Sequence, residues 1–379
     1  MIERYLEKLL LEHLFQNKTV VLYGARQTGK TTLVDEVVSK LKRKSLVLSG
    51  DDADIRALFD NATAARFRPV VTGHEIVIID EAQRIQDAGL GIKLMHDNFR
   101  EIQLIVTGSS SLELAAKIKE PMTGRKYEFC LYPLSFGELS KHNGFLEEKR
   151  TLEQRLVFGS YPDVVVNPGR EKRILKELTS DYLYKDILAI GGIKKPVLLE
   201  KIVKALALQV SNEVSFNEVA QICGSDHGTV EKYVDLLERA FIVFRLPGLS
   251  RNVRNEIKKG KKIYFFDNGI RNAILGNFLP LQSRVDTGAL WENYLISERV
   301  KLTSGMDARP EAFFWRTTQQ QEIDYIEEER GEFRAYEFKW NPEKKAALSK
   351  TFSNAYPVKS FGVINPENYH EFLSETDGI

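Results

Sequence analysis

The sequence predicts an α/β protein whose first domain is built on a central parallel sheet and whose later segments form further domains. Two observations carry this prediction. Short apolar runs, Val20 to Tyr23, Ile76 to Ile79 and IQLIV at residues 102–106, alternate with segments of helical periodicity. Each run also leads into glycine or polar residues, which is where α/β sheets place their binding groups. With 379 residues, the chain suits two or three domains.

Composition narrows the class of protein further. Apolar residues make up 43% of the chain and charged residues 28%, an ordinary globular mixture, and the formal net charge is only +1. Any binding to nucleic acid must therefore come from local basic patches. The two cysteines, Cys130 and Cys223, lack the spacing of a metal site and suit a reducing compartment. Residues 1–15 predict an amphipathic helix and not a secretory signal, and no apolar run approaches the roughly 20 residues that span a bilayer. We expect a soluble, cytoplasmic protein with no membrane partner.

The first apolar run leads into GARQTGKT, which matches the pattern G-x-x-x-x-G-K-[ST] and is followed by a helical segment. Glycines are needed there because successive backbone N–H groups must turn inward around phosphate oxygens, at the positive end of a helix. This context favours a P-loop over a chance glycine-rich turn. Lys30 is expected to reach the β- and γ-phosphates of ATP, and Thr31 to offer its hydroxyl to Mg²⁺. The expected nucleotide-binding residues are Gly24, Ala25, Arg26, Gln27, Thr28, Gly29, Lys30, Thr31 and Thr32.

A second buried strand, EIVIIDEAQRI, ends in two carboxylates. We expect Asp80 to hold the Mg²⁺ water shell and Glu81 to polarise the attacking water, because phosphoryl transfer asks mainly for positioning and charge. The alternative is that these acids only begin a helix, and their distance from the P-loop in the sequence favours the catalytic interpretation. A further strand is expected at Ser45 to Asp52.

The third run, IQLIVTGSSSLEL, ends in Thr107, Gly108, Ser109 and Ser110. Together these strands resemble the AAA-type branch of P-loop ATPases, in which a polar residue on such a strand senses the γ-phosphate. The resemblance implies this role for Ser109, with Ser110 close behind. Alternatively, the serines cap the helix that begins near Leu112.

Arg125, in MTGRKYEFCLYPLSFGEL, resembles the arginine of a "GR…PLS…E" stretch found in one bacterial and archaeal group of AAA-type ATPases. The resemblance implies that it neutralises γ-phosphate charge in its own subunit or in a neighbour's. The alternative is a structural pair with Glu138. AAA-type sites usually form between subunits, so a homo-oligomer, such as a ring, is expected. This ATPase domain is assigned to residues 1–150, followed by a helical link or lid at residues 151–200 that resembles the "GSYP…Y…KDIL" linker of the same group.

Residues 201–280 predict a winged-helix domain, since two short helices around Gly224 are followed by a strand and a basic hairpin. The second helix, His227 to Arg239, is the candidate recognition helix. Residues 251–262 hold six Lys or Arg against one Glu, as expected of a wing that grips DNA phosphates. The alternative is a protein-packing module with a solvated, charged edge. The candidate nucleic-acid contacts are His227, Thr229, Lys232, Arg251, Arg254, Lys258, Lys259, Lys261 and Lys262.

Residues 281–379 predict a helix, three strands, a helix and a strand, an order that resembles the restriction-endonuclease-like core of PD-(D/E)XK nucleases. The resemblance implies that Asp324 and Glu337 bind Mg²⁺ or Mn²⁺, that Lys339 orients a water, and that Glu292 completes the site. Glu337 and Lys339 are two residues apart and therefore leave the same face of their strand. Ile323 stands where the motif has proline. The alternative is a surface charge pair at a strand edge.

These features lead to two functional hypotheses. The first is Mg²⁺-dependent ATP hydrolysis coupled to DNA binding or remodelling, as in a translocase, a helicase or an ATP-gated nuclease. The second is an ATP-dependent oligomerising signalling switch whose C-terminal domain binds protein and is not catalytic.

Overall fold

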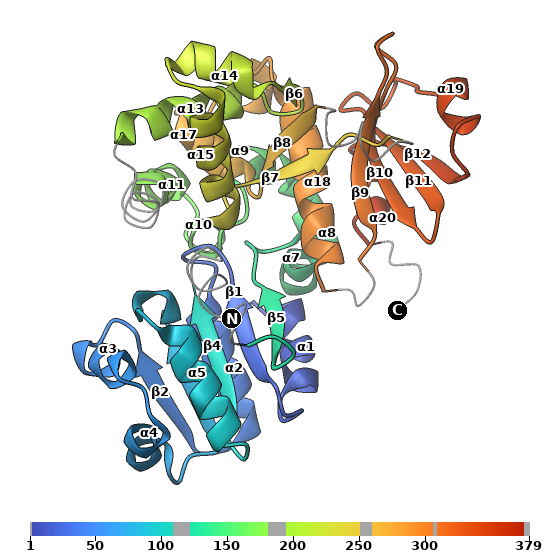
Figure 1. Ribbon diagram of the computed structural model, residues 1–379. Coiled ribbons are helices and arrows are strands. Elements are labelled where there is room, and N and C mark those ends of the chain that lie inside the picture. The colour runs from blue at the N-terminus through green and yellow to red at the C-terminus, as the bar shows by residue number, and fades with distance from the viewer. Residues whose placement is uncertain (1, 109–121, 181–194, 251–259, 306–308, 375–379) are drawn as a thin grey trace. The chain divides into compact units, whose positions relative to one another are not determined.

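The computed structural model describes residues 2–108, 122–180, 195–250, 260–305 and 309–374 (Figure 1). The chain forms two compact units, one of Met1–Leu134 with Arg239–Phe241, the other of Ser135–Glu238 with Ile242–Ile379. The first unit ends at Leu134 and not at the expected residue 150, because Ser135 begins a helix with a full capping box that packs within the second unit. The segments expected as link, second domain and third domain all fall in that second unit. Within the described ranges, no helix has the length and apolar character needed to cross a bilayer.

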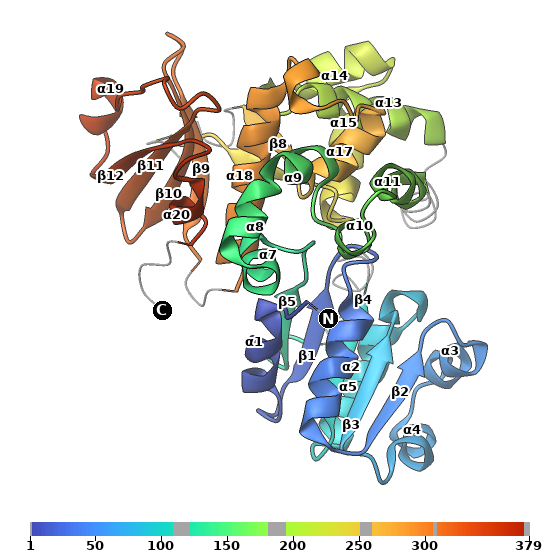
Figure 2. The same ribbon diagram turned by 180° about the vertical axis from the view of Figure 1, so that it is seen from behind.

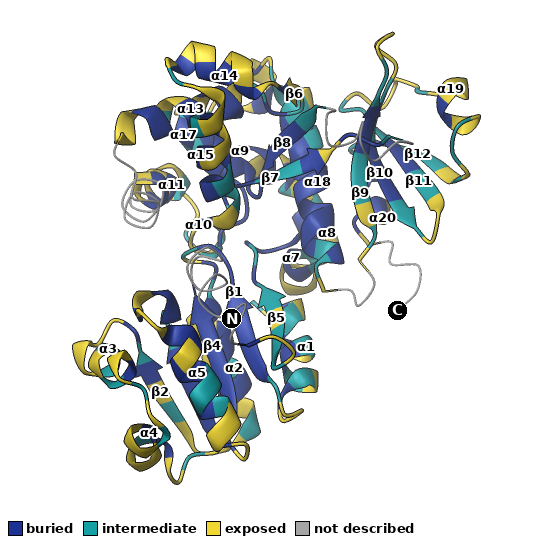
Figure 3. Cartoon of the chain, in the orientation of Figure 1, coloured by how far each residue is buried: buried dark blue, intermediate teal, exposed yellow. Residues whose placement is uncertain are grey.

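The first unit contains a five-stranded sheet in the order β2-β3-β4-β1-β5, in which all neighbours pair in parallel. The three central strands are buried on both faces, as continuous β-branched runs predict, and the expected extra strand forms one edge of the sheet (Figure 3). The strands are β1 (Thr19–Tyr23), β2 (Ser45–Ser49), β3 (Ile76–Asp80), β4 (Gln103–Gly108) and β5 (Lys126–Cys130).

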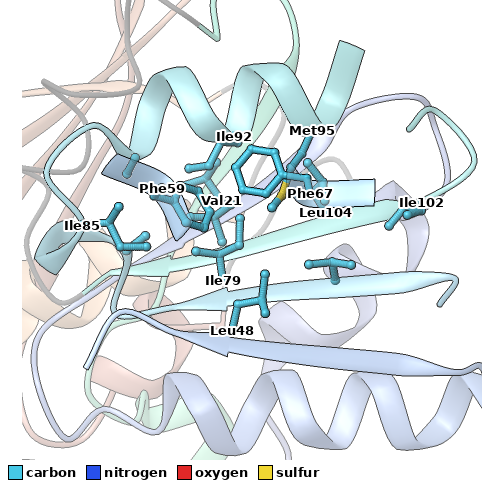
Figure 4. Packing of buried hydrophobic residues seen from close by; sticks show 14 of the residues in the cluster. Val21, Leu48, Phe59, Phe67, Ile79, Ile85, Ile92, Met95, Ile102 and Leu104 are labelled. Atoms are coloured by element: carbon cyan, nitrogen blue, oxygen red, sulfur yellow. The ribbon is translucent and has the colours of Figure 1, made fainter. Parts of the chain in front are cut away.

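Helices cover both faces of this sheet. On one face, α1 (Tyr5–His13) and α2 (Lys30–Leu41) pack their apolar side chains against Val20 and Leu22 (Figure 2). On the other face lies a cluster that includes Phe59, Phe67 and Ile92 packed around Val21 and Ile79 (Figure 4). The helices that supply this second cluster are α3 (Ala53–Asp60), α4 (Ala64–Val71) and α5 (Ala88–Asn98). Alternate residues of β1 thus face opposite cores, which fixes the strand that leads into the P-loop.

The second unit begins with helices and a small antiparallel sheet of order β6-β8-β7. The helices before this sheet are α7 (Phe136–Asn143), α8 (Phe145–Arg150), α9 (Leu152–Phe158), α10 (Pro162–Val166) and α11 (Glu171–Thr179). Around and after it come α13 (Pro196–Leu208), β6 (Glu213–Val214), α14 (Phe216–Cys223), α15 (His227–Arg239), β7 (Val243–Pro247), β8 (Lys261–Phe265) and α17 (Asn268–Leu275).

A buried polar network holds the start of α17 in place. Asp267 caps this helix by accepting from the Ile270 N–H at 3.2 Å, and it also accepts from the Ser160 N–H at 2.7 Å. Gly159 has a φ of 70°, and a Cβ there would lie 2.0 Å from the Asp267 carboxylate. Lys301 donates to the Ser160 hydroxyl at 3.0 Å. The GSYP stretch, residues 159–162, is therefore fixed by side chains from the start of α17 and from residue 301 later in the same unit.

The C-terminal part has the element order that the sequence predicts, and its sheet runs β12-β11-β10-β9. Strands β9, β10 and β11 are antiparallel neighbours, whereas β11 and β12 are parallel. The expected helix around EKKAALSKTFSNAY is much shorter, since only Lys350–Ser353 are helical. The elements are α18 (Thr287–Thr303), β9 (Glu311–Arg316), β10 (Glu322–Glu329), β11 (Glu332–Phe338), α19 (Lys350–Ser353), β12 (Val358–Ile364) and α20 (Tyr369–Phe372).

The two sheets of the second unit are joined by backbone contact. The Leu249 N–H donates to the Phe314 carbonyl at 2.7 Å, and Gly248 forms a parallel bridge with Phe314. A Cβ on Gly248 would lie 3.2 Å from the Phe314 ring, closer than ordinary contact. The three-stranded sheet is thereby fixed beside β9 of the four-stranded sheet.

Candidate nucleotide site and carboxylate cluster

The loop between β1 and α2 has the geometry of a phosphate cradle. The helix begins at Lys30, directly after Gly29, whose φ is 91° and whose Cβ position is open space. Gly24 has a φ of 154°, and a Cβ there would lie only 2.2 Å from the Leu131 carbonyl oxygen. Glycine is therefore required at both ends of the loop, and the free amides of the first turn of α2 open toward it.

Lys30 lies folded back on this loop. Its side chain is 7% exposed, and its Nζ donates to the carbonyl oxygens of Gly24 at 3.0 Å and Ala25 at 2.9 Å. Burial lowers the pKa of Lys30 to about 8, while the nearby carboxylates of Glu81 and Asp80 act in the opposite direction. Two neutral carbonyls are weak partners for a buried ammonium, so a phosphate group would be a better one.

The acidic strand and its neighbour form a hydrogen-bonded unit at the carboxyl edge of the sheet. The Thr107 hydroxyl, fully buried at the end of β4, donates to Asp80 Oδ1 and accepts from the Glu81 N–H at 3.3 Å. Gln83 donates to Glu81 Oε2. The sequence predicts Thr107 only as one of several polar residues at the end of a strand. In the structure its hydroxyl links the Asp80 carboxylate to the Glu81 backbone. Ser109 and Ser110 lie outside the described residues.

The oxygen ligands at this edge fit Mg²⁺. Thr31 is exposed at the first turn of α2, and Asp80 is half-buried at the end of β3. Mg²⁺ in nucleotide sites takes one or two protein oxygens and fills its octahedron with waters and phosphate oxygens. Among the residues that the structure describes, no three His, Cys, Asp or Glu side chains gather closely enough to hold a metal by themselves. Thr31 and Asp80 are the residues that would hold Mg²⁺ beside a bound nucleotide.

Two further residues support the site, Arg4 at the loop and Gly50 at the acidic strand, and neither was expected from the sequence. Arg4, 9% exposed, donates to the Thr28 carbonyl at 2.8 Å and to the Tyr132 carbonyl at 2.6 Å. Gly50 donates its N–H to the Asp80 carbonyl at 2.8 Å, and a Cβ there would lie 2.4 Å from the Glu81 carbonyl oxygen. In the sequence, the glycine of SLVLSGDD was the one feature that could have predicted the close approach of residue 50 to Asp80.

Arg125 lies at the opposite edge of the sheet from the P-loop. Its carbonyl accepts from the Thr19 N–H at 2.9 Å, and the next residue pairs with Thr19 at the start of β1. The P-loop follows Tyr23, the last residue of β1, so the length of the strand, about 13 Å, separates the two. The Arg125 side chain forms an ion pair with Asp97 at 3.0 Å. The expectation that Arg125 reaches the γ-phosphate of its own subunit is corrected accordingly, and only a role toward a neighbouring subunit stays a prediction.

In the second unit, Asp324, Glu337 and Lys339 converge as the sequence predicts. Tyr325 pairs with Tyr336, which brings the residues before and after them opposite each other on β10 and β11. Lys339 Nζ lies 2.6 Å from Glu337 Oε2 and 3.8 Å from Asp324 Oδ2. Asp324 also accepts from the backbone N–H of the residue after Glu337, at 2.8 Å.

Glu292 joins this cluster from α18, but its partners come from β8. Its Oε1 accepts from Lys262 Nζ at 3.0 Å and from the Tyr264 hydroxyl at 2.6 Å. Lys262 also lies 2.6 Å from Glu322, and its side chain is only 1% exposed. The expectation that Lys262 contacts DNA phosphates is therefore corrected, because its ammonium is buried among carboxylates.

The charges of the cluster shift one another's titration. The pKa of Glu292 is raised to about 7, chiefly by burial; Lys262 opposes this shift and the neighbouring Asp324 adds to it. Burial and Asp324 likewise raise the pKa of Glu337. Burial lowers the pKa of Lys262, but Glu292 and Glu322 outweigh it and hold the pKa above its usual value. The four carboxylates, referred to below as the carboxylate cluster, are Glu292, Glu322, Asp324 and Glu337.

This arrangement does not fit the divalent metal that the nuclease resemblance implies. A metal ion needs carboxylate oxygens that are free to coordinate. Glu292 and Glu322 are bonded to Lys262, and Glu337 is bonded to Lys339.

The described nucleic-acid candidates lie on α15 and at the start of β8. His227 and Lys232 are exposed, with His227 Nδ1 at 4.0 Å from Glu231. The Thr229 hydroxyl donates a hydrogen bond to the Asp226 carboxylate at 2.7 Å. This hydroxyl is therefore already engaged in a contact at the start of α15. Lys261 Nζ lies 4.6 Å from the centre of the Phe216 ring. Arg251, Arg254, Lys258 and Lys259 lie outside the described residues.

Comparison with known families separates the chain into three parts. Residues 16–140 match a family described as an AAA domain. The chain carries an AAA-type P-loop ATPase domain. Residues 149–280 and 287–376 match two families described as domains of unknown function, DUF8612 and DUF4143.

Similar proteins span most of the chain of this AAA-type protein. An uncharacterized protein of Mycobacterium tuberculosis is 24% identical over 366 residues, covering 94% of this chain and 78% of its own. One of Haemophilus influenzae is 23% identical over 297 residues, covering 72% and 73%. Among solved structures, a Walker-type ATPase of Pyrococcus abyssi aligns with a TM-score of 0.52 at 15% identity, over 73% of this chain and 96% of that one. At this identity the likeness concerns the fold.

Proposed function

We propose that the protein hydrolyses ATP with Mg²⁺ in its first unit and uses the resulting rearrangement to bind or remodel DNA through its second unit. The observation that carries the ATPase part is the buried Lys30, whose ammonium donates to two loop carbonyls, at 2.9 and 3.0 Å, beside the acidic strand. A site prepared in this way is completed by a triphosphate.

The chemistry at the P-loop follows from the positions of these side chains. Backbone N–H groups of the loop and of the first turn of α2 bind the phosphates, and Lys30 moves from the loop carbonyls to the β- and γ-phosphates. Thr31 and Asp80 hold Mg²⁺, which neutralises phosphate charge when bound. Glu81 accepts a hydrogen bond from the attacking water and orients it. Thr107 keeps Asp80 and the backbone of Glu81 in register with each other.

The DNA-binding part of the proposal is supported by the order α13, β6, α14, α15, β7, β8 in the second unit, which is the order of winged-helix domains. The turn between α14 and α15 contains Gly224 in the left-handed region, with a φ of 67°. However, α15 itself carries three acidic residues against two of Lys and Arg. Phosphate attraction must therefore come chiefly from Lys232, Lys261 and the basic residues between 251 and 259.

Gel shifts of the full chain on single strands, duplexes, forks and four-way junctions, with Mg²⁺ and a non-hydrolysable ATP analogue, test this proposal. The double variant Lys232→Ala and Lys261→Ala is expected to bind more weakly and to lower the slope of log K against log salt by about 2. The matched control is Lys204→Ala, an exposed lysine on α13. No retention of any DNA form at low salt would remove the DNA-binding part.

A second candidate is the oligomerising switch with a non-catalytic C-terminal domain, and the lysine-filled carboxylate cluster favours its non-catalytic half. The position of Arg125, far from its own P-loop, also supports an ATP site shared between subunits of a homo-oligomer. Slow hydrolysis that is indifferent to DNA, together with nucleotide-dependent assembly in light scattering, would favour this candidate over the first.

A further inference from the structure

The most unusual group in the second unit is the Lys262 ammonium. Its side chain is 1% exposed, and it lies 3.0 Å from Glu292 Oε1 and 2.6 Å from Glu322 Oε1. Burying an unpaired ammonium is far more costly than burying one that is paired with carboxylates. Here two carboxylates pair with it, so Lys262 is the cation around which this side of the cluster is organised.

The same oxygens are the ones that a divalent metal would need. Glu292 Oε1 already accepts from both Lys262 and the Tyr264 hydroxyl, at 3.0 and 2.6 Å. Lys339 bonds Glu337 at 2.6 Å and approaches Asp324 at 3.8 Å. Each carboxylate of the cluster thus has a lysine within ion-pair distance, so the cluster already holds positive charge of the kind that a metal ion would supply.

Lys262 is held in this position by backbone structure on both sides. It is the second residue of β8, where it pairs with Glu213 of β6 and with Leu246 of β7. Tyr264, two residues along the strand, leaves the same face and bonds the same carboxylate. The lysine therefore enters the cluster from a strand of the three-stranded sheet, whereas Asp324 and Glu337 lie on the four-stranded sheet.

We infer that Lys262 takes the place of a divalent metal ion in this cluster and holds the nuclease-like site in a metal-free, inactive state. The consequence for activity rests on the resemblance of the C-terminal domain to nucleases, whereas the predicted metal binding does not. The contact that Lys262 of β8 makes with the cluster is then autoinhibitory. A metal could bind only after a change at β8 withdraws this lysine.

Mn²⁺ titration of the full chain, followed by electron paramagnetic resonance of the free ion, tests this inference. All samples carry Asp80→Asn, so that the P-loop contributes no metal site. The parent chain is expected to show no saturable Mn²⁺ binding at the cluster. Lys262→Met, which removes the charge and keeps the length, is expected to gain one site at least about tenfold tighter than any binding by the parent. Adding Asp324→Asn to Lys262→Met should abolish the gained site.

Lys261→Met is the matched control, because its ammonium lies over Phe216 and not in the cluster, and it should leave Mn²⁺ binding unchanged. The inference is overturned if Lys262→Met is folded, by circular dichroism and thermal melting, and gains no site. It is also overturned if the parent binds Mn²⁺ and loses the ion with Asp324→Asn, a result that does not require the Lys262 variant to fold.

Cleavage of plasmid DNA by the same samples separates this inference from the nuclease activity that the resemblance implies. If Lys262→Met binds Mn²⁺ but does not cleave, the inference stands and the nuclease-like consequence fails. If the parent chain binds Mn²⁺ and cleaves with loss in Asp324→Asn, the inference fails and a metal-dependent nuclease function stands.

Discussion

Two buried lysines show how the partners of a charge decide what a site can do. Lys30 bonds neutral carbonyls, and burial lowers its pKa to about 8. Lys262 bonds carboxylates, which raise its pKa in spite of burial. The first ammonium is left to bind an incoming anion, while the second has already satisfied the carboxylates around it.

The lowered pKa of Lys30 predicts that ATP binding weakens at high pH. A triphosphate binds the charged lysine, so above a pKa of about 8 binding must take up a proton. We expect the association constant, measured calorimetrically, to fall by up to about tenfold per pH unit above this value. Lys30→Arg should bind with little pH dependence in this range, because arginine stays charged. An affinity for the unmodified chain that is constant from about pH 7 to pH 9.5 would contradict the assignment.

Thr107 offers a second test at the scale of one residue. Thr107→Val keeps the shape but removes the hydroxyl that bonds Asp80 and the Glu81 N–H. We expect kcat to fall by about 10- to 100-fold with a small change in ATP affinity, and unfolding free energy to fall by about 1–3 kcal/mol. Thr72→Val, which removes an exposed hydroxyl bonded to the Arg68 carbonyl, is the control. Equal kcat in both variants would show that Thr107 has no part in hydrolysis.

Sequence reasoning at the level of single residues succeeded where a motif is local. The P-loop glycines, Lys30 and the acidic strand are contiguous stretches, and their backbone geometry follows from the residue types. The approach of Asp324 to Glu337 was implied by the resemblance to PD-(D/E)XK nucleases, and strand periodicity predicted only that Glu337 and Lys339 share a face. Lys262 could not be placed in this way, because it ends a run of basic residues and only the packing of α18 beside β8 shows that it is buried.

At the scale of elements, β5 changes the interpretation of Arg125. The residue precedes a strand that runs parallel to β1, so it belongs to the amino edge of the sheet, whereas the P-loop follows the carboxyl edge. The direction of a strand as short as KYEFC cannot be read from its residues alone, so the sequence left open whether Arg125 acts in its own subunit or in a neighbouring one. The short α19 is a similar case, since helical periodicity over EKKAALSKTFSNAY exceeded what the tertiary structure forms.

The place of Arg125 predicts complementation between subunits. Arg125→Ala should leave ATP affinity of the isolated subunit unchanged and reduce kcat by a factor of about 10³ or more in an assembled oligomer. Mixing Arg125→Ala with Lys30→Ala should restore part of the activity, because some interfaces then combine an intact P-loop with an intact arginine. Full activity of Arg125→Ala at every protein concentration would leave only its ion pair with Asp97.

At the scale of the whole molecule, the two units differ in whether their sites can accept a ligand as they are folded. The P-loop of the first unit is arranged to receive a nucleotide with its metal, and the carboxylate cluster of the second has its cations built in. The sequence predicts strands β1 to β4 of the five-stranded sheet, but not β5, and it predicts the order of the elements that form the C-terminal sheet. The helical link, the three-stranded sheet and the C-terminal sheet form one unit through long-range contacts such as the Gly248–Phe314 bridge. No local sequence pattern predicts such contacts.

The most direct test of the proposed function is ATP turnover by the full chain with Mg²⁺, measured with and without forked and duplex DNA. We expect slow basal hydrolysis that at least one DNA form accelerates, and loss of hydrolysis without loss of ATP binding in Glu81→Gln. Turnover that no DNA form changes, or that persists in Glu81→Gln, would contradict the proposal.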